Sequence, residues 1–476
     1  MSTEGQHRIE HDALGDVRVP ADAYYGAQTV RAIENFPISG LRLPRAFIAA
    51  TATIKRAAAE VNAALGLLDP KIAAAIAQAA QEVIEGKWDA QFPIDAFQMG
   101  AGTSQNMNAN EVIANRAIEL LGGRRGNYQI VHPNDHVNMA QSTNDVTPTA
   151  IRLAALMTLG DLLAVLETLV EALGQKAHEF DDIVKAGRTH LQDAVPVRLG
   201  QEFGAYALAV ANDIERIKNA RERLLYLGIG GTATGTGLNA DPQYHARMVR
   251  RLSELTGLPL RGSGNLFESM QNTADALECS AALRTLTATL TRIANDLRLM
   301  TSGPNTGLDE IRLPPVLPGS SIMPGKVNPS MAEMLNMVCF HVMGNDLTVL
   351  LATQAGQLEL NVMLPVIALN VLQSIQLLTN GVRAFTDRCV RGITANEARC
   401  RHWVEHSAAL ATALNPYLGY SKVAEVVKEF VRTGQPIRQI ILDRGLLSEA
   451  QLNDILSVRA MTEPGIPGKA AGKARG

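Results

Sequence analysis

The feature that most constrains the fold is the central stretch of the chain, residues 142–397, which consists mainly of long helical patterns. Apolar residues recur there at spacings of three and four, which places them on one face of a helix. The first such series is Leu156, Leu159, Leu163, Leu166, Val170 and Leu173. Similar series occupy Gly200–Leu227, Asp275–Met300 and Met331–Leu351. Helices of this length are typical of a bundle that also packs against other subunits.

Composition supports an all-α fold. Aromatic residues make up only 4% of the 476 residues, whereas alanine and leucine are abundant, which favours helices packed closely on helices. The chain is too long for one ordinary core. We predict an N-terminal helical domain (1–141), a central helix-bundle domain (142–397) and a small C-terminal helical domain (398–476). The last of these is expected to end in a disordered basic tail over 465–476.

Local patterns predict individual helix boundaries. Two N-terminal segments, Ala46–Leu67 and Lys71–Ile84, have helical patterns and are bounded by loops rich in Gly, Pro and Asn. At the start of the central stretch, Thr147 precedes Pro148. A threonine before a proline is typical of an N-cap followed by a first-turn proline. We therefore expect the first central helix to begin at Thr147.

Charge and hydropathy exclude several classes of partner. A net charge of −3 favours neither nucleic acid nor an anionic membrane. Residues 1–15 mix charge with polarity and lack the apolar core of a secretory signal. No uninterrupted apolar run approaches membrane-spanning length, so we expect a cytoplasmic protein. The four cysteines form no C-x-x-C pair and are predicted to be buried small hydrophobes.

Three apparent binding motifs are rejected because their sequence context does not fit. Residues 228–233 match a relaxed dinucleotide fingerprint, but a helical pattern precedes them where that motif needs a strand. Residues 319–326 resemble a phosphate-binding loop that is one residue too long, and Val327 stands where the motif needs Ser or Thr. His132 and His136 lack a third ligand, and a proline interrupts the helix between them, so we interpret them as solvated or structural histidines.

Four polar clusters remain between the apolar helical stretches, at residues 100–108, 141–145, 187–193 and 319–329. Taken singly, Ser, Thr, Asn and Asp before a helix are usually caps. Together the clusters offer hydroxyls, amides, helix N-termini, a lysine and a histidine. Helix N-termini and hydroxyl donors bind carboxylates without a large net charge, so this inventory suits a small dicarboxylate.

These four clusters closely resemble the signatures of the aspartase/fumarase superfamily, and residues 319–329 resemble its long and specific Ser-Ser loop. The resemblance extends from about residue 16 to residue 449. It implies a three-domain, all-α subunit that assembles into a homotetramer whose central domains form a multi-helix core. Each active site would draw loops from three subunits. The resemblance implies no metal and no organic cofactor.

Within the superfamily, the loops are more similar to aspartate ammonia-lyases than to class II fumarases. Gly100–Ser104, His136 and Thr143 carry much of that likeness. The resemblance implies reversible deamination of L-aspartate to fumarate and ammonia through an aci-carboxylate intermediate. Three alternatives stay open: hydration of fumarate to L-malate, elimination from another amine adduct of fumarate, and a non-catalytic structural role like that of the lens crystallins.

The resemblance also implies a role for each site residue, with Ser320 as the catalytic base. Lys326 and nearby amides would favour its oxyanion, and Glu333 would orient His190. The implied catalytic residues are Ser320, His190, Lys326 and Glu333. The implied substrate-binding residues are Thr103, Ser142, Thr143, Asn144, Thr189, Ser321 and Asn328.

Three positions depart from the aspartate ammonia-lyase pattern. Leu364 and Gln354 stand where that pattern usually has Glu, and Asn305 replaces a customary Arg. None of the three belongs to the four polar clusters, so we expect the chemistry to survive. They bear instead on substrate choice, on subunit contacts and on any effector site.

Overall fold

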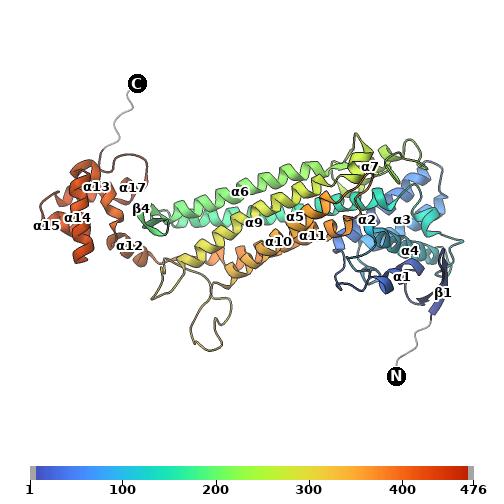
Figure 1. Cartoon of the computed structure of the whole chain (residues 1–476), viewed down its shortest axis with the longest axis horizontal. Helices are drawn as coiled ribbons and strands as arrows, with labels where there is room; N and C mark the ends of the chain where they lie inside the picture. The colour runs from blue at the N-terminus through green and yellow to red at the C-terminus, as the bar shows by residue number, and fades with distance from the viewer. Residues whose placement is uncertain (1–6, 470–476) are drawn as a thin grey trace. The chain divides into compact units, whose positions relative to one another are not determined.

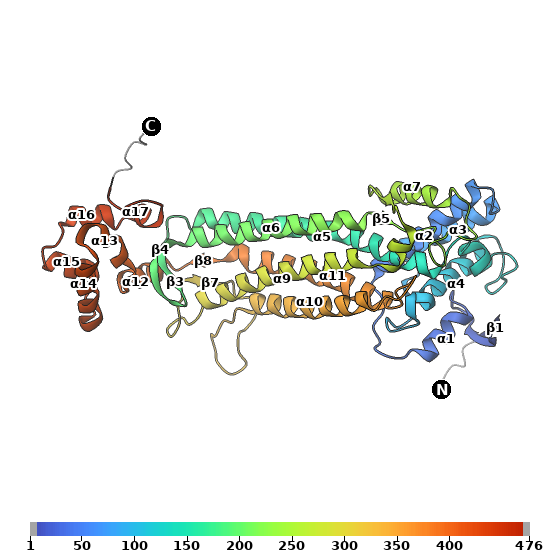
Figure 2. The same cartoon turned by 45° about the horizontal axis from the view of Figure 1, so that its top comes forward.

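The computed structural model describes residues 7–469 and is built mainly from helices (Figures 1 and 2). The predicted all-α class is confirmed. The described chain divides into two compact units. The first holds the residues up to Ala164 together with Asp213–Thr287 and Val338–Asn380, and the second holds Val165–Asn212, Ala288–Met337 and the residues from Gly381 onward.

Five long helices contribute residues to both units: α5 (Thr143–Glu179), α6 (Leu199–Leu224), α9 (Ala274–Met300), α10 (Ser330–Gln354) and α11 (Leu364–Arg388). The predicted helices at 200–227, 275–300 and 331–351 are therefore confirmed within a few residues. Within the first unit, polar side chains join neighbouring helices. Ser280 of α9 donates to Asp346 of α10 at 2.7 Å, and Asn345 of α10 donates to Ser374 of α11 at 3.1 Å.

The rest of the first unit surrounds a core of small and branched apolar residues. Its helices are α1 (Ala27–Asn35), α2 (Arg45–Ala64), α3 (Pro70–Ile84), α4 (Thr103–Leu120), α7 (Tyr244–Thr256) and α8 (Leu266–Gln271). Ile76 of α3 and Ile113 of α4 lie fully buried in this core. Asp69 caps α3 and Pro70 opens it, which agrees with the predicted helix at 71–84. Two short sheets complete the unit, β1 (His7–Asp12) with β2 (Gly15–Pro20), and β5 (Tyr226–Leu227) with β6 (Arg261–Gly262).

The second unit ends in six short helices, of which those within residues 411–455 surround a separate small core, while Val404 and Met461 pack in a second cluster with Ala186. The six helices are α12 (Glu397–Glu405), α13 (Ala411–Leu418), α14 (Tyr420–Thr433), α15 (Ile437–Asp443), α16 (Glu449–Ile455) and α17 (Val458–Thr462). Its two sheets pair β3 (Val184–Thr189) with β4 (Gln192–Arg198), and β7 (Ile311–Arg312) with β8 (Thr394–Ala395). Residues 470–476 of the expected tail lie outside the described residues. Residues 465–469 are ordered by local contacts, because Tyr417 donates a hydrogen bond to the Pro467 carbonyl.

Two expectations about the central stretch need correction or context. The first central helix begins at Thr143 and not at Thr147, so Pro148 lies inside it. Two helices, α5 and α10, are also long and apolar enough to cross a membrane by length and composition. Core helices of globular proteins pass the same test, and 56% of the most apolar α5 window is buried within the protein. The three-domain division stays a prediction, with α5 and α12 beginning beside its two boundaries.

Several smaller expectations are confirmed. All four cysteines are buried, as expected of small core residues. His132 caps a short π-helical turn, Pro133–Val137, because its Nδ1 accepts from the amides of Asn134 and Asp135. His136 Nδ1 accepts the His132 amide at 2.9 Å. Both histidines therefore have structural partners, as predicted.

Candidate active site

The predicted site residues fall into two sets. Four of them belong to the first unit and lie at the N-termini of two helices: Thr103, Ser142, Thr143 and Asn144. Seven belong to the second unit and lie mainly in a hairpin and a loop: Thr189, His190, Ser320, Ser321, Lys326, Asn328 and Glu333. We describe each set within its own unit.

The residues that precede α4 form a tight turn. Ala101 and Gly102 both have positive φ, +61° and +86°, and the Ala101 amide donates to the Val362 carbonyl at 2.9 Å. Helix α4 starts at Thr103, directly after this turn, with no side-chain cap from Gly102. The amide of Gln105 in its first turn donates to Gln98 Oε1 at 2.8 Å. A pocket of about 350 Å³ beside the turn is lined in part by Thr103 and Arg31. Arg31 is paired with Asp12 at 2.8 Å in the same pocket, so attraction for a carboxylate comes here from the helix N-terminus.

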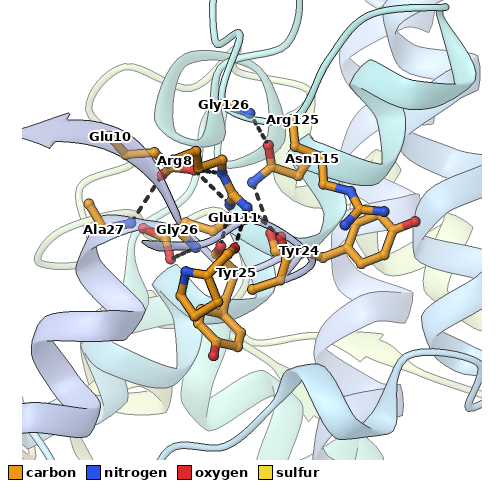
Figure 3. A network of polar contacts seen from close by, with 12 residues as sticks. Arg8, Glu10, Tyr24, Tyr25, Gly26, Ala27, Glu111, Asn115, Arg125 and Gly126 are labelled. Atoms are coloured by element: carbon orange, nitrogen blue, oxygen red, sulfur yellow. Dashed lines mark hydrogen bonds and ion pairs between the residues drawn. The ribbon is translucent and has the colours of Figure 1, made fainter. Parts of the chain in front are cut away.

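Helix α4 is fixed in place by a buried polar network (Figure 3). The Glu111 carboxylate accepts hydrogen bonds from the backbone amides of Gly26 and Gln28, at 2.8 and 2.9 Å, at the start of α1. One turn further along α4, Asn115 donates to the Tyr24 carbonyl at 2.8 Å and accepts the Gly126 amide at 2.7 Å. These bonds satisfy buried backbone groups. They leave α4 little freedom to move relative to α1.

The start of α5 is built by side chains that replace ordinary capping by Thr147. Ser142 precedes the helix, and its Oγ accepts the amide of Asn144 at 3.2 Å. The Asp145 carboxylate folds back to accept the Ser142 amide at 2.9 Å. With these caps, the helix can begin four residues before Thr147 and tolerate Pro148 in its second turn. Pro148 supplies no amide donor to the preceding turn.

A glycine-rich loop completes the pocket around Asp145. The backbone amides of Gly230 and Thr232 donate to the Asp145 carboxylate at 2.9 and 3.0 Å, and Asn144 donates to the Ala233 carbonyl at 2.8 Å. Burial raises the pKa of Asp145 to about 6, although these amides oppose the shift. The glycines that resemble a dinucleotide fingerprint therefore hold an internal carboxylate. The loop is strained, because the β-branched Thr232 has φ +55°.

Beneath Thr143 lies a buried lysine that sequence patterns did not single out. The Lys55 side chain is fully buried, and its Nζ donates to Asn138 Oδ1 at 2.8 Å and Gln141 Oε1 at 2.9 Å. Burial lowers the pKa of Lys55 to about 7, against the attraction of Asp145. In the sequence, Lys55 is one more residue of an alanine-rich helix. Its role is visible only from the residues that the fold places around it.

In the second unit, Thr189 and His190 stand at the tip of a hairpin, where we expected a loop between helices. Strands β3 and β4 are joined by a two-residue turn in which His190 and Leu191 have φ of +54° and +57°. Such turns favour Asn and Gly. A histidine and a leucine there store local strain, which is frequent at functional sites. The side chains at this tip are exposed in a single chain.

A buried carboxylate supports the base of this hairpin. Glu310 is fully buried and pairs with Arg188 at 2.7 Å and with Lys185 at 2.9 Å. Lys185 also pairs with Glu202 at 2.9 Å. Burial disfavours the charged form of Lys185, but the two carboxylates outweigh it and raise its pKa. No sequence pattern singles out Glu310, because its partners lie more than a hundred residues away.

The loop before α10 presents Ser320. Its Oγ accepts the backbone amides of Met323 at 2.9 Å and of Ile322 at 3.2 Å. The neck of the loop is narrow, because Asn328 donates to the Gly319 carbonyl. A Cβ added to Gly319 would also collide with the Lys326 carbonyl oxygen. Glycine is therefore required at 319 to close the loop.

The remaining predicted residues of the second unit lie in this loop or in the helix that follows it. Ser321 and Lys326 are exposed, and Glu333 lies half-buried in the first turn of α10. Among residues 7–469, no hydrogen bond or ion pair joins Glu333 to His190, so their pairing stays a prediction. Within the same range, no group of three His, Cys, Asp or Glu side chains could hold a metal ion.

The three departures from the expected pattern differ in their surroundings. Leu364, the first residue of α11, is fully buried, so a glutamate there would place a charge in an apolar core. Gln354, the last residue of α10, and Asn305 are exposed. The structure explains the leucine but offers no reason for the other two.

Comparison with known proteins identifies the class to which this fold and loop belong. Residues 15–344 match a protein-family model described as lyase. Residues 410–463 match a second model, described as the fumarase C C-terminus. Because the first match covers more than half of the chain, the chain belongs to this lyase family.

Individual relatives show which members of the lyase family this chain is similar to. The chain is 52% identical to the aspartate ammonia-lyase of Bacillus subtilis (strain 168), over 98% of this chain and 99% of the relative. It is also 52% identical to the class II fumarate hydratase of Halobacterium salinarum, over 97% and 98%. A crystal structure of a fumarate lyase:delta crystallin from Brucella melitensis superimposes with a TM-score of 0.93, at 47% identity over 96% and 100%.

Proposed function

We propose that this chain is an aspartate ammonia-lyase, which eliminates ammonia from L-aspartate to give fumarate and catalyses the reverse addition. The observation that carries the proposal is the geometry of Ser320. Its oxygen accepts two backbone amides in a loop that glycine closes. Most of the relatives compared share the aspartate ammonia-lyase name at 47–52% identity.

The chemical difficulty of this reaction is the acidity of the Cβ proton. Its removal gives the neighbouring β-carboxylate a second negative charge, so the site must stabilise an aci-carboxylate dianion better than it stabilises the substrate. We assign Thr103, Ser142, Thr143 and Ser321 to the β-carboxylate. Three of them lie at the N-termini of α4 and α5, where the helix dipole favours negative charge.

The base is Ser320. A serine hydroxyl is far too weakly acidic to serve unaided, so its oxyanion requires nearby donors. The amides of Ile322 and Met323 supply two, and Lys326 in the same loop supplies a positive charge. The Ser320 oxyanion takes the Cβ proton, and the electron pair moves into the aci-carboxylate. The same electron pair then forms the C=C bond of fumarate as the C–N bond breaks and ammonia leaves.

The other end of the substrate needs a second set of contacts. We assign its α-carboxylate to Thr189, Lys326 and Asn328, and its amino group to Asn144 and His190. Glu333 would orient His190. No step in this scheme requires a metal or an organic cofactor.

These assignments draw on both units and imply an oligomer, which we propose is a homotetramer with active sites shared among three subunits. One helix face supports this. Phe340, Leu347 and Leu351 of α10 are 57, 56 and 52% exposed in a single chain, and their spacing places them along one stripe. A stripe of exposed large apolar side chains marks an interaction surface. Sedimentation of the purified protein would measure the number of subunits in the oligomer. We expect the protein to act in the cytoplasm.

A second candidate function is hydration of fumarate to L-malate. The specific observation in its favour is the 52% identity to the Halobacterium salinarum fumarate hydratase. Water and ammonia are similar in size, so one site could in principle serve either leaving group. The aspartase-like Thr143 and the Gly100–Ser104 loop favour ammonia. Elimination from a larger amine adduct of fumarate uses the same machinery.

The experiment is an ultraviolet assay for fumarate with purified protein and L-aspartate or L-malate offered separately. We expect fumarate from aspartate alone. Fumarate from malate alone would replace the proposal with the hydratase. Protein that is folded and tetrameric yet inactive with both would contradict both functions and direct the search to other amine adducts.

A further inference from the structure

A short chain of side-chain amides connects the buried Lys55 to Thr143. Asn106, on α4, donates from Nδ2 to Thr143 Oγ1 and to Asn138 Oδ1, both at 3.2 Å. Asn138 Oδ1 also accepts from Lys55 Nζ at 2.8 Å. Asn106 and Lys55 are 4% and 0% exposed. The three links run within the first unit and end at the proposed β-carboxylate site.

The chemistry of the groups fixes the direction of every bond in this chain. The Asn138 nitrogen donates to the Gln141 carbonyl at 3.3 Å, so the Asn138 atom that faces Lys55 and Asn106 is the amide oxygen. An amide oxygen only accepts, so the Asn106 atom that faces Asn138 must be its nitrogen. The same nitrogen faces Thr143. The Asn106 oxygen has no hydrogen-bond partner among the described protein atoms, so the amide is held through its nitrogen alone.

The consequence falls on the hydroxyl of Thr143. Because its oxygen accepts from Asn106, its proton must point elsewhere. We propose that Asn106, locked by Asn138 and Lys55, is a positioning residue that makes Thr143 a hydrogen-bond donor to the substrate's β-carboxylate. This inference rests on the proposed function. A donor fixed before the reaction loses no energy in reorienting as charge develops on the carboxylate.

The test reverses the direction of the hydrogen bond between Asn106 and Thr143. Asn106→Asp keeps the shape of the side chain but replaces the donor by an acceptor, so the Thr143 hydroxyl turns toward the new carboxylate. Asn108→Asp is the matched control. Asn108 is also buried on α4, and it donates one hydrogen bond to the Gln91 carbonyl at 2.9 Å, which is unconnected with Thr143. Both variants are compared by thermal unfolding, sedimentation and steady-state fumarate production from aspartate.

We expect Asn106→Asp to lower kcat about 100-fold, the usual effect of losing one preorganised donor, with KM for aspartate nearly unchanged. Asn108→Asp should lower stability comparably and leave kcat within a fewfold. Inhibitors separate positioning from general damage. The nitronate form of 3-nitropropionate imitates the aci-carboxylate, whereas succinate imitates the ground state. Asn106→Asp should weaken nitronate binding about tenfold more than succinate binding.

A second variant covers the case in which Asn106→Asp does not fold. Asn138→Leu removes the anchor and leaves Asn106 free to turn, which should lower kcat about tenfold with the same selective loss of nitronate affinity. Equal losses for both inhibitors, or an Asn108→Asp variant as impaired as Asn106→Asp, would overturn the inference. Failure of the proposed function is a separate result, because the unaltered protein would then make no fumarate from aspartate.

Discussion

The two halves of the candidate site are built in opposite ways. In the first unit, Thr103 and Thr143 lie at the ends of long helices, and buried groups such as Lys55 and Asp145 hold their surroundings. In the second unit, Ser320 and His190 lie in a loop and at a hairpin tip that are largely exposed in a single chain. One half is enclosed, whereas the other is presented to solvent.

The difference indicates that one half stabilises developing charge and the other transfers the proton. A group that stabilises developing charge is effective only if it is oriented before the reaction, which requires burial and fixed partners. A group that takes and returns a proton must reach the substrate and exclude water when it arrives, which suits a loop that can close. We expect substitutions in the loop to affect turnover without affecting stability. Substitutions in the enclosed half should affect stability, and those that hold Thr143 in place should affect turnover as well.

The largest effect should come from Ser320→Ala. Removing the base should lower kcat for aspartate by about 1,000-fold, while the melting temperature and the oligomeric state stay unchanged, because the residue is held only by local backbone amides. Ser263→Ala, at an exposed turn of the first unit, is the control for the same chemical change. Retained turnover in Ser320→Ala would remove the central role that we assign to this loop.

A smaller effect should come from opening the neck of the loop. Gly319→Ala would push a Cβ against the Lys326 carbonyl, so the loop must widen, and we expect kcat to fall about 100-fold, as when a catalytic group is displaced by about 1 Å. Gly325→Ala is the comparison within the same loop. It has φ +79° with no atom within 4 Å of the added Cβ, so its cost is backbone strain alone. If the two variants were equally active, the narrow neck would be irrelevant to catalysis.

The smallest effect concerns stability in the enclosed half. Folding lowers the pKa of Lys55 from 10.5 to about 7, so between these values the unfolded chain binds more protons and stability rises with pH. The slope from this group is at most about 1.4 kcal/mol per pH unit. Denaturant unfolding of Lys55→Met between pH 7 and 10 should lack that component.

Lys185→Met provides the contrast in the second unit. The pKa of Lys185 is raised on folding by Glu202 and Glu310, despite its burial, so its contribution is lost only as pH rises above 10.5. Between pH 7 and 10, this variant should keep the slope of the unaltered protein. Equal slopes in Lys55→Met and the unaltered protein would mean that folding does not lower the pKa of Lys55.

Much of the fold could be read from the sequence, because periodicity reports burial directly. The series at 275–300 and 331–351 predicted α9 and α10 within three residues. The start of α5 was missed, since Thr147-Pro148 has the local signature of a helix start. The actual cap uses Asp145, whose remaining partners are the amides of Gly230 and Thr232. A local pattern cannot report a carboxylate that is satisfied from so far along the chain.

The candidate site divides in the same way. The loop at residues 319–329 was predictable as a loop, because the polar cluster is contiguous and distinctive, whereas the role of Ser320 stays a proposal. Lys55 and Glu310 were not predictable, because neither differs from its neighbours in type or spacing. The surroundings that distinguish each residue are buried partners from distant segments of the chain. The hairpin around His190 was also missed, since a turn with two positive φ angles normally contains Asn or Gly.

The turn before α4 has a consequence for how the protein is made. Its Ala101 amide is paired with the Val362 carbonyl, and the start of α5 depends in the same way on Gly230. A ribosome must therefore synthesise more than three quarters of the chain before the first helix end of the site can be closed. Contacts that span such lengths form late and slowly. The candidate site should be among the last parts of this protein to acquire its final structure.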